Sequence, residues 1–246
     1  MLSVESFTQV LIKKKVFDFK EVIKKRDGTF VTDLDLEINN LFFKFKEKMG
    51  YEDNVISEET GDESILTIPS FVIDPVDGTN GLILGNGEWS VSLARLKSWR
   101  ISSSENEGVI YQPTSGIIFD INSTKEPLAI EDKIRILVSR SEYEKGFFSN
   151  IVSKDVELVP MGSIALKLAY LASGKCDGII TLRKKSIWDI AAGLVLLSRT
   201  QKHFFSDHTG RDILNFNNDI LYNPPLIFGT KSAKQRLIEL TNKCLN

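Results

Sequence analysis

Two aspartates end a run of bulky apolar residues in the stretch FVIDPVDGTNG, residues 71–81. Asp74 and Asp77 stand three positions apart, with Pro75 between them. A buried strand presents its last side chains at the end of a sheet, where connecting segments often build functional sites. Two carboxylates there suit Mg²⁺, which prefers hard oxygen ligands, water and substrate phosphate, and the carbonyl oxygen of Val76 would add another ligand. The same residue types also suit a simple turn, so this stretch alone leaves both interpretations open.

Two further acidic stretches favour the metal site. Glu58, in ISEET, precedes Asp74 by sixteen residues, and Asp189, in IWDIAAG, begins a strongly apolar segment. An aspartate at the start of a helix commonly acts only as a cap. All three acidic clusters border apolar segments, however, so we expect their carboxylates to converge. Converging carboxylates repel one another, and a folded protein tolerates this when a cation neutralises them. The pattern therefore predicts a divalent metal site.

The composition is that of an ordinary globular chain. The 246 residues are 42% hydrophobic and 26% charged, with a formal net charge of −2. This balance gives no electrostatic reason to expect a nucleic-acid polymer as partner, and no apolar run is long enough to predict a membrane span. The N-terminus lacks the apolar core of a signal peptide. Two distant cysteines and two histidines predict neither a disulfide framework nor a zinc cluster, so we expect a reduced, cytoplasmic protein.

Helices and strands are mixed without a strict βαβ rhythm. Apolar periodicity and capping residues predict four helices, at 32–48, 163–174, 190–200 and 231–245. Short β-branched runs predict strands at 71–74, 88–96, 107–113, 115–121, 134–140 and 176–182. Gly, Pro and Ser residues separate the first four of these strands, which predicts antiparallel pairing. The polar segment 125–133 is the candidate boundary between an N-terminal half, 1–130, and a C-terminal half, 131–246.

The three acidic motifs resemble those of a known superfamily. SEET, DPVDGTNG and WDIAAG, in this order and spacing, are similar to the motifs of the lithium-sensitive, Mg²⁺-dependent phosphomonoesterases. These include inositol monophosphatases, fructose-1,6-bisphosphatases and 3'(2'),5'-bisphosphate nucleotidases. The resemblance runs from Thr32 to the helix after Asp189. It implies a mixed α/β (α+β) fold, a layered αβαβα sandwich. The N-terminal half would carry the first two motifs, and the C-terminal half would add Asp189 and most selectivity contacts across a cleft.

The resemblance also implies a set of metal ligands. They would hold two or three Mg²⁺ ions, one of which Li⁺ would displace as an inhibitor. The implied ligands are the side chains of Glu58, Asp74, Asp77 and Asp189 and the carbonyl oxygen of Val76. Two metals about 3.5–4 Å apart can stabilise the attacking and the leaving oxygen of an in-line displacement. Such chemistry needs no histidine, which agrees with our expectation that His203 and His208 are loop residues.

Three catalytic residues follow from the same resemblance. Thr79 would orient the attacking water together with an acidic partner, and Glu58 belongs to the catalytic group as well as to the metal ligands. Asp33 matches an acidic position that helps to hold a further metal or its water. The backbone amides of Gly78 and Thr79, at the start of a short helix, would bind phosphate oxygens.

The residues that would select the substrate resemble bisphosphate nucleotidases more than inositol monophosphatases. After the metal-binding aspartates the chain has DGTNG, with Asn80 where nucleotidases have lysine, instead of the DGTxNF of inositol monophosphatases. The SRS segment at Arg140 resembles the nucleotidases too, although Arg140 is either an anion contact or a plain charge at a strand end. We expect Lys167 to be a helix-surface residue.

A basic segment precedes the third motif. Inositol monophosphatases usually carry a sugar-binding glutamate seven residues before the motif's aspartate, and here that position is Leu182. It is followed by Arg183, Lys184 and Lys185. Such a cluster suits a second phosphate better than a neutral polyol, and a solvated loop accounts for it about as well.

These features lead to one main functional hypothesis and two alternatives. The main hypothesis is a phosphatase whose metal-activated water hydrolyses 3'-phosphoadenosine 5'-phosphate to AMP and phosphate. The first alternative is an inositol-1-monophosphatase or a sugar (bis)phosphatase. The second is a non-catalytic binding or regulatory protein, which predicts the loss of a motif carboxylate or of the threonine, and all of these are present. The partner would be a small phosphorylated substrate, and the family resemblance also implies a homodimer.

Overall fold

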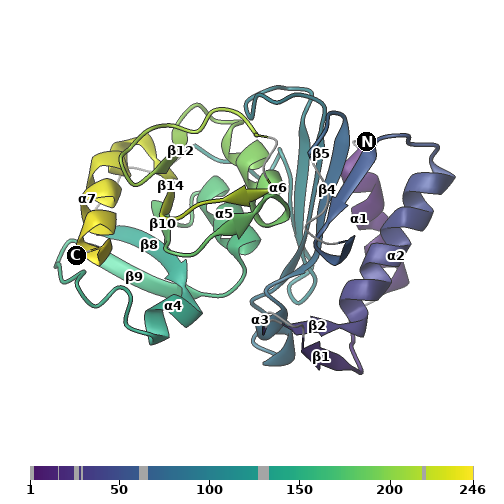
Figure 1. Cartoon of the computed structure of the whole chain (residues 1–246), viewed down its shortest axis with the longest axis horizontal. Coiled ribbons are helices and arrows are strands. Elements are labelled where there is room, and N and C mark those ends of the chain that lie inside the picture. The colour runs from purple at the N-terminus through teal and green to yellow at the C-terminus, as the bar shows by residue number, and fades with distance from the viewer. Residues whose placement is uncertain are drawn as a thin grey trace.

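The computed structural model describes residues 3–15, 17–24, 28, 30–60, 66–126, 133–217 and 220–245. Helices and sheets alternate in five layers (Figure 1). Helices α1 (Ser3–Lys14) and α2 (Asp33–Lys48) cover one face of the first sheet, and α5 (Ile164–Ala172) and α6 (Ile187–Leu197) lie between the two sheets. Helix α7 (Lys234–Leu245) covers the far face of the second sheet. The expected αβαβα sandwich is confirmed.

The first sheet has the strand order β3-β4-β5-β6-β7. Its strands are β3 (Asn54–Ser57), β4 (Ser70–Asp77), β5 (Ser90–Leu96), β6 (Glu107–Gln112) and β7 (Ile117–Phe119). The pairs β4–β5, β5–β6 and β6–β7 are antiparallel, as the turn residues predicted, and β3 runs parallel to β4. All of β4 is buried, because Phe71 and Ile73 face the cluster under α1 and α2 while Val72 faces the cluster around α5 and α6.

The second sheet has the strand order β12-β14-β10-β8-β9. Its strands are β8 (Ile134–Ser139), β9 (Val156–Met161), β10 (Gly178–Thr181), β12 (His203–Asp207) and β14 (Leu226–Thr230). Strand β8 pairs in parallel with β9 and β10, whereas β14 is antiparallel to β10 and β12. Leu237 of α7 packs so closely on this sheet that a Cβ on Gly229 would lie 2.4 Å from its Cδ1 atom.

The central helices bring the two sheets together. Helix α6 is apolar on nearly all sides and is therefore buried along most of its length. Two glycines allow the close packing: a Cβ on Gly193 of α6 would lie 2.4 Å from Cβ of Leu168, and one on Gly108 of β6 would lie 2.8 Å from the carbonyl oxygen of Ala192. This packing fixes where α6 begins, which matters for Asp189.

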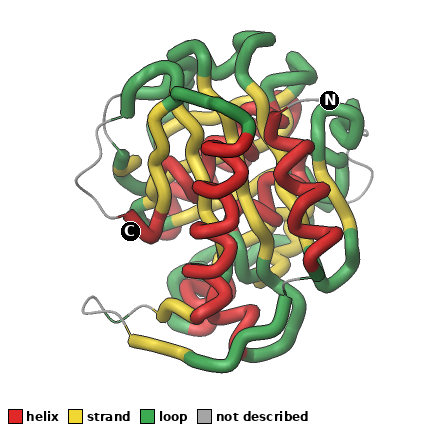
Figure 2. The backbone as a smooth tube through the Cα atoms, turned by 90° about the vertical axis from the view of Figure 1, so that its right-hand side faces the viewer, coloured by secondary structure: helices red, strands yellow, loops and turns green. Residues whose placement is uncertain are grey.

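Smaller elements surround the main layers. They are the paired strands β1 (Val22–Lys24) and β2 (Phe30–Thr32), the paired strands β11 (Lys185–Ser186) and β13 (Leu221–Tyr222), the helices α3 (Thr79–Ile83) and α4 (Arg140–Glu144), and the 3₁₀ turns η1 (Glu58–Thr60) and η2 (Lys231–Ala233). Figure 2 shows α1 and α2 lying across the first sheet. Phe7 and Phe42 join these two helices through an edge-to-face contact of 5.1 Å between ring centroids.

Most expected elements are present, and two local expectations were wrong. His203 was expected in a loop; it is buried and begins β12, with Nδ1 2.6 Å from the Thr200 hydroxyl. Lys167 was expected on a helix surface and is buried in α5. The proposed boundary near residue 131 lies outside the described residues, within 127–132. In the described part of the chain, no helix has the length and apolar character needed to cross a membrane.

Candidate metal centre

Asp74 and Asp77 lie on a bulged strand end. Strand β4 continues through both aspartates, and its register against β5 shifts between them, at the position of Pro75. The chain turns at the next residue, Gly78, whose φ of +92° lies in the region that favours glycine. A Cβ there would also lie 2.5 Å from the carbonyl oxygen of Glu88, so the turn leaves no room for a side chain.

Glu58 reaches the same place through the strand register. Strands β3 and β4 are parallel and pair Ser57 with Ile73, so the next residues, Glu58 after the end of β3 and Asp74 within β4, lie side by side. The sixteen-residue spacing of these two acids equals the offset of this register. Glu58 lines the same pocket as Asp74 and helps to raise the pKa of Asp74.

Helices α2 and α6 begin in the same way. In each, an aspartate at the third helical position accepts a hydrogen bond from the residue that precedes the helix. At α6, Oδ2 of Asp189 accepts the Ser186 N–H at 2.8 Å. At α2, Oδ2 of Asp35 accepts the N–H of Thr32 at 2.8 Å and its O–H at 2.5 Å. These are capping boxes, which satisfy amide groups at a helix start. The other oxygen of Asp35 is buried without a hydrogen-bond partner.

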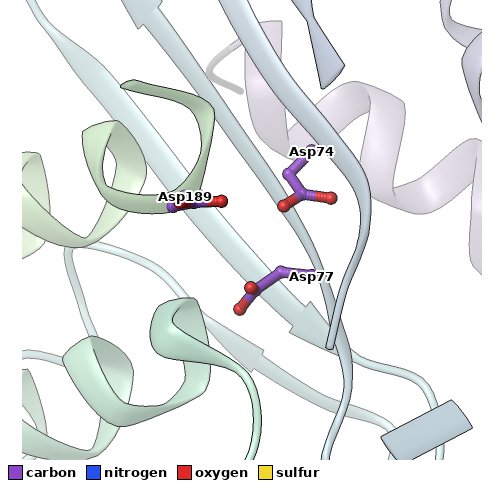
Figure 3. A group of neighbouring side chains, drawn as sticks. All are labelled: Asp74, Asp77 and Asp189. Carbon is purple, nitrogen blue, oxygen red and sulfur yellow. The ribbon is translucent and has the colours of Figure 1, made fainter. Parts of the chain in front are cut away.

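Three aspartates meet in the site (Figure 3). One carboxylate oxygen from each of Asp74, Asp77 and Asp189 lies within 4.8 Å of the others. Each residue has one oxygen held by the protein: Asp74 Oδ1 accepts the Val76 N–H at 3.0 Å, and Asp77 Oδ2 accepts the Ala165 N–H at 2.6 Å. The hydroxyl of Ser163 also donates to Asp77. The arrangement leaves oxygens for a shared cation, and the donor set fits Mg²⁺.

The electrostatics of the site favour a cation. Burial raises the pKa of Asp74 well above its usual range, and the charges of Glu58 and Asp77 raise it further. Burial also raises the pKa of Asp189 and of Asp35, each to about 6. Charged carboxylates in such a place are costly unless a positive charge neutralises them. The site is therefore suited to a divalent metal.

The aspartates line a pocket of about 700 Å³ that has an acidic and a basic wall. Its basic side chains are those of Arg140, Lys145, Lys167, Arg183 and Lys185. Of the expected substrate contacts, the pocket includes Gly78, Thr79, Asn80, Arg140 and Arg183. Lys184 does not line it and is exposed, whereas its neighbour Lys185 does line it.

Arg140 is bound to Glu88 and is more than a charge at a strand end. Its Nε donates to a Glu88 oxygen at 3.0 Å, and Nη2 donates to the other Glu88 oxygen and, at 3.0 Å, to the carbonyl of Pro160. Glu88 also accepts the N–H of Gly162 at 2.8 Å. The pair therefore braces the segment 160–163, which ends at Ser163, the hydroxyl partner of Asp77.

Lys167 lies inside the pocket because its long side chain folds back over the start of its own helix, the direction in which helical side chains point. The side chain is 3% exposed, and Nζ donates to the carbonyl oxygens of Met161 at 3.0 Å and Gly162 at 3.2 Å. Burial and the nearby charge of Lys185 lower its pKa to about 8. Lys167 is a pocket residue that sequence reasoning missed.

The two acids at the start of α2 differ in their surroundings. The carboxylate of Asp33 accepts the backbone amides of Lys20 and Glu21, at 2.9 and 3.1 Å, and does not line the pocket. Asp35 does not line the pocket either, but it is buried and close enough to Asp74 to help raise the pKa of Asp74. The sequence TDLD indicates this position of Asp35, because the aspartate follows a capping threonine by three residues. In SIWD, Asp189 follows the capping Ser186 by the same three residues.

Strand alternation moves the substrate-facing position as well. Thr181, the last residue of β10, lines the pocket, whereas Leu182 packs against the core of the second sheet. The position used in the comparison with inositol monophosphatases, Leu182, therefore does not line the pocket. Within the turn after β4, the hydroxyl of Thr79 donates to the carbonyl oxygen of Val76 at 3.2 Å, which ties two of the expected site groups together.

Comparisons with known proteins find similar proteins over most of the chain. The profile of the inositol monophosphatase family matches residues 3–200. The "Fructose-1,6-bisphosphatase/inositol-1-monophosphatase" of Thermotoga maritima is 25% identical over 219 residues, 83% of this chain and 82% of that protein. The "Nus factor SuhB" of Escherichia coli is 27% identical over 238 residues, 89% of this chain and 87% of that protein. An IMPase/NADP phosphatase solved with NADP and Ca²⁺ has a TM-score of 0.76 at 17% identity and covers 98% of this chain and 94% of that one.

Proposed function

The chain belongs to the inositol monophosphatase family and is a metal-dependent phosphatase of that type, and within the family we propose that it is a 3'(2'),5'-bisphosphate nucleotidase. Its reaction would be hydrolysis of 3'-phosphoadenosine 5'-phosphate to AMP and phosphate. The proposal is carried by the basic wall of the pocket, whose side chains line the same pocket as a metal centre that would itself account for one phosphate.

We assign the metal as Mg²⁺, held by Asp74, Asp77 and Asp189, with Glu58 beside them. The bound metal would supply a water of lowered pKa and stabilise charge on the attacking and leaving oxygens. The Val76 carbonyl and the Thr79 hydroxyl stand at the same turn, so the expected roles of both are kept as proposals. For the acidic partner we propose Asp35 in place of Asp33, because its buried Oδ1 is unpaired and available to accept a proton.

The second phosphate is assigned to the basic wall. Burial raises the pKa of Asp77, and Lys167 and Lys185 are both close enough to oppose this rise, so two cationic side chains lie beside the aspartates. Nζ of Lys167 has three N–H groups and uses two on carbonyl oxygens, which leaves one for a ligand. Arg183 adds a guanidinium at the rim. Such a wall binds a dianion better than a neutral polyol.

Phosphate release by the Mg²⁺-loaded protein tests the proposal. The substrates are 3'-phosphoadenosine 5'-phosphate, inositol 1-phosphate and fructose 1,6-bisphosphate at equal concentration. We expect the nucleotide to have the highest kcat/KM, and Asp77→Asn to abolish release while the protein stays folded. Asp155→Asn, at an exposed carboxylate bound to Arg236, is the matched control and keeps full activity. A preference for inositol 1-phosphate would refute the nucleotidase assignment and leave the phosphatase intact.

Two observations favour other candidates. Thr181 offers the pocket a hydroxyl, which suits a polyol, and relatives carry inositol and fructose phosphatase names, so an inositol-1-monophosphatase or sugar (bis)phosphatase is the second candidate. The name of the Escherichia coli relative supports a regulatory protein. No release from any of the three esters, with Mg²⁺ binding retained, would favour that candidate.

Three further expectations are part of the proposal. Li⁺ would inhibit by displacing one of two or three Mg²⁺ ions, which a LiCl titration at fixed Mg²⁺ tests. A homodimer would show in the mass measured by light scattering. A cytoplasmic location would show in cell fractionation.

A further inference from the structure

A second pocket lies at the end of α6 that is remote from Asp189. Its volume is about 880 Å³, against about 700 Å³ for the metal pocket, and the two share no lining residue. Leu197, which lines it, stands about 12 Å from Asp189 along the helix axis. Its walls come from the loop at 98–104, the end of α6, the start of β12, the segment 212–214 and Lys231. The proposed reaction does not use this pocket.

The lining of the second pocket carries an excess of positive charge. Arg100, Arg199 and Lys231 are its cationic side chains, and Asp212 is its one carboxylate. Oδ1 of Asp212 already accepts a hydrogen bond from Nζ of Lys234 at 2.8 Å. Within the described ranges, no carboxylate forms an ion pair with any of the three cations. A negatively charged group would balance them.

Of the three cations, Arg199 gives the strongest evidence for a missing anionic partner. Its Nη1 donates to the carbonyl oxygen of Ser103 at 3.3 Å and its Nη2 to that of Asn106, while its Nε is buried without a hydrogen-bond partner. Burial lowers the pKa of this guanidinium, and no acid is close enough to oppose the shift. Arg199 as a whole is half-buried, and a cation in such a place with only neutral partners is costly, to which the unpaired N–H adds.

A structural role for Arg199 explains part of this arrangement. Its two Nη groups fasten the loop at 103–106 to the end of α6, and that would be sufficient for packing. The unpaired Nε, the nearby charges of Arg100 and Lys231 and the size of the pocket are left unexplained. Part of the lining is apolar, since Leu194, Phe204 and Phe205 belong to it.

We propose that this pocket binds a small organic anion, a phosphate or a carboxylate joined to an apolar body. Arg199 contacts the anionic group from the wall, and Arg100 and Lys231 attract it at the rim. The apolar body lies against the leucine and phenylalanine side chains. The hydroxyl of Ser102, which accepts the Nε–H of Arg100 at 3.1 Å, keeps its own proton for the ligand.

Binding of two probes that share a ring tests the proposal and identifies the anionic group. Phenylphosphonate and benzoate are titrated calorimetrically into the full chain with Mg²⁺ present, and the Asp77→Asn protein separates this site from the metal centre. We expect a site that survives Asp77→Asn and is weakened about 10- to 100-fold by Arg199→Met, the range for a hydrogen bond to a charged group. Lys231→Met, at an exposed position, should weaken it about 2- to 5-fold.

Arg211→Met is the matched control, because Arg211 is exposed and lines neither pocket. It should leave the affinity unchanged. The probe that binds with the higher affinity identifies the anionic group of the ligand as a phosphate or a carboxylate. If neither probe binds in the Asp77→Asn protein, or if Arg199→Met and Lys231→Met bind as tightly as the control, the proposal fails. If Arg199→Met does not fold, Lys231→Met decides, and unchanged affinity there overturns the proposal.

Discussion

Replacing Asp189 by asparagine should stabilise the metal-free protein while it destroys the metal site. The asparagine has nearly the same shape, and its side-chain oxygen can still accept the Ser186 N–H that starts α6. What the substitution removes is a negative charge that lies within 4.8 Å of the carboxylates of Asp74 and Asp77. Without a metal, that charge opposes folding.

Two independent arguments give the size of the effect. Two unit charges 4.8 Å apart repel by about 3.5 kcal/mol at an effective dielectric constant near 20. The rise in the pKa of Asp189 from 3.8 to about 6 corresponds to about 3 kcal/mol. For a chain of this length, each kcal/mol shifts Tm by about 2–4 °C. We therefore expect the metal-free variant to melt about 6–14 °C above the wild type at pH 7.5.

The stability difference between Asp189→Asn and the wild type should depend on pH. Because the pKa of Asp189 is raised on folding, its charge costs stability above pH 6, and this cost disappears as the pH falls towards 4. The advantage of Asp189→Asn should therefore vanish near pH 4.

Thermal melts followed by circular dichroism, in EDTA and in Mg²⁺, measure the effect. Mg²⁺ at 100 times its Kd adds about 2.7 kcal/mol to a protein that binds it, so the wild type should recover most of the difference and the variant should not. Asp155→Asn is the control of opposite sign, since Arg236 and Ser153 hold the pKa of Asp155 at about 2. A metal-free Asp189→Asn protein that melts below the wild type, or gains as much from Mg²⁺, would refute the reasoning.

Three other substitutions test separate parts of the site. Asp35→Asn should lower kcat about 100-fold or more, because it removes the proposed proton acceptor. The Tm of the metal-free protein should not fall. A kcat within a few-fold of the wild-type value would exclude this role. Lys167→Met should raise KM for 3'-phosphoadenosine 5'-phosphate about 10-fold and leave KM for inositol 1-phosphate unchanged. An equal change in both KM values would argue against contact of Lys167 with a second phosphate. Gly78→Ala should cost at least about 1–2 kcal/mol in chemical denaturation, because φ is positive and the Cβ would meet Glu88, and unchanged stability would contradict the tight turn.

The layers of the fold and the convergence of the acids could be predicted because they follow from local patterns and motif order. Glu58 and Asp74 are an example, since their spacing equals the register of two parallel strands. The choice between Asp33 and Asp35 depended on which acid faces inward from the first turn of α2. Periodicity left that choice open, and the capping pattern would have decided it.

Residues whose role depends on partners distant in sequence were not predictable. Lys167 is polar on a helix that is otherwise apolar, and only the packing of the segment before that helix shows that its ammonium group turns inward. Arg140 is defined by Glu88, which lies 52 positions away. The second pocket depends on Arg199 meeting a loop nearly a hundred residues earlier, and nothing local in the sequence indicates it.

The anchored carboxylates have a consequence for which ion the centre prefers. Asp74, Asp77 and Asp189 each keep one oxygen on a backbone N–H, which favours coordination of a metal through the other oxygen alone. Calcium gathers six to eight oxygens and often takes both atoms of a carboxylate, whereas magnesium is satisfied with six ligands in a compact octahedron and keeps several waters. Carboxylates held in this way would favour magnesium over calcium, and they would leave room at the ion for water and for a substrate phosphate.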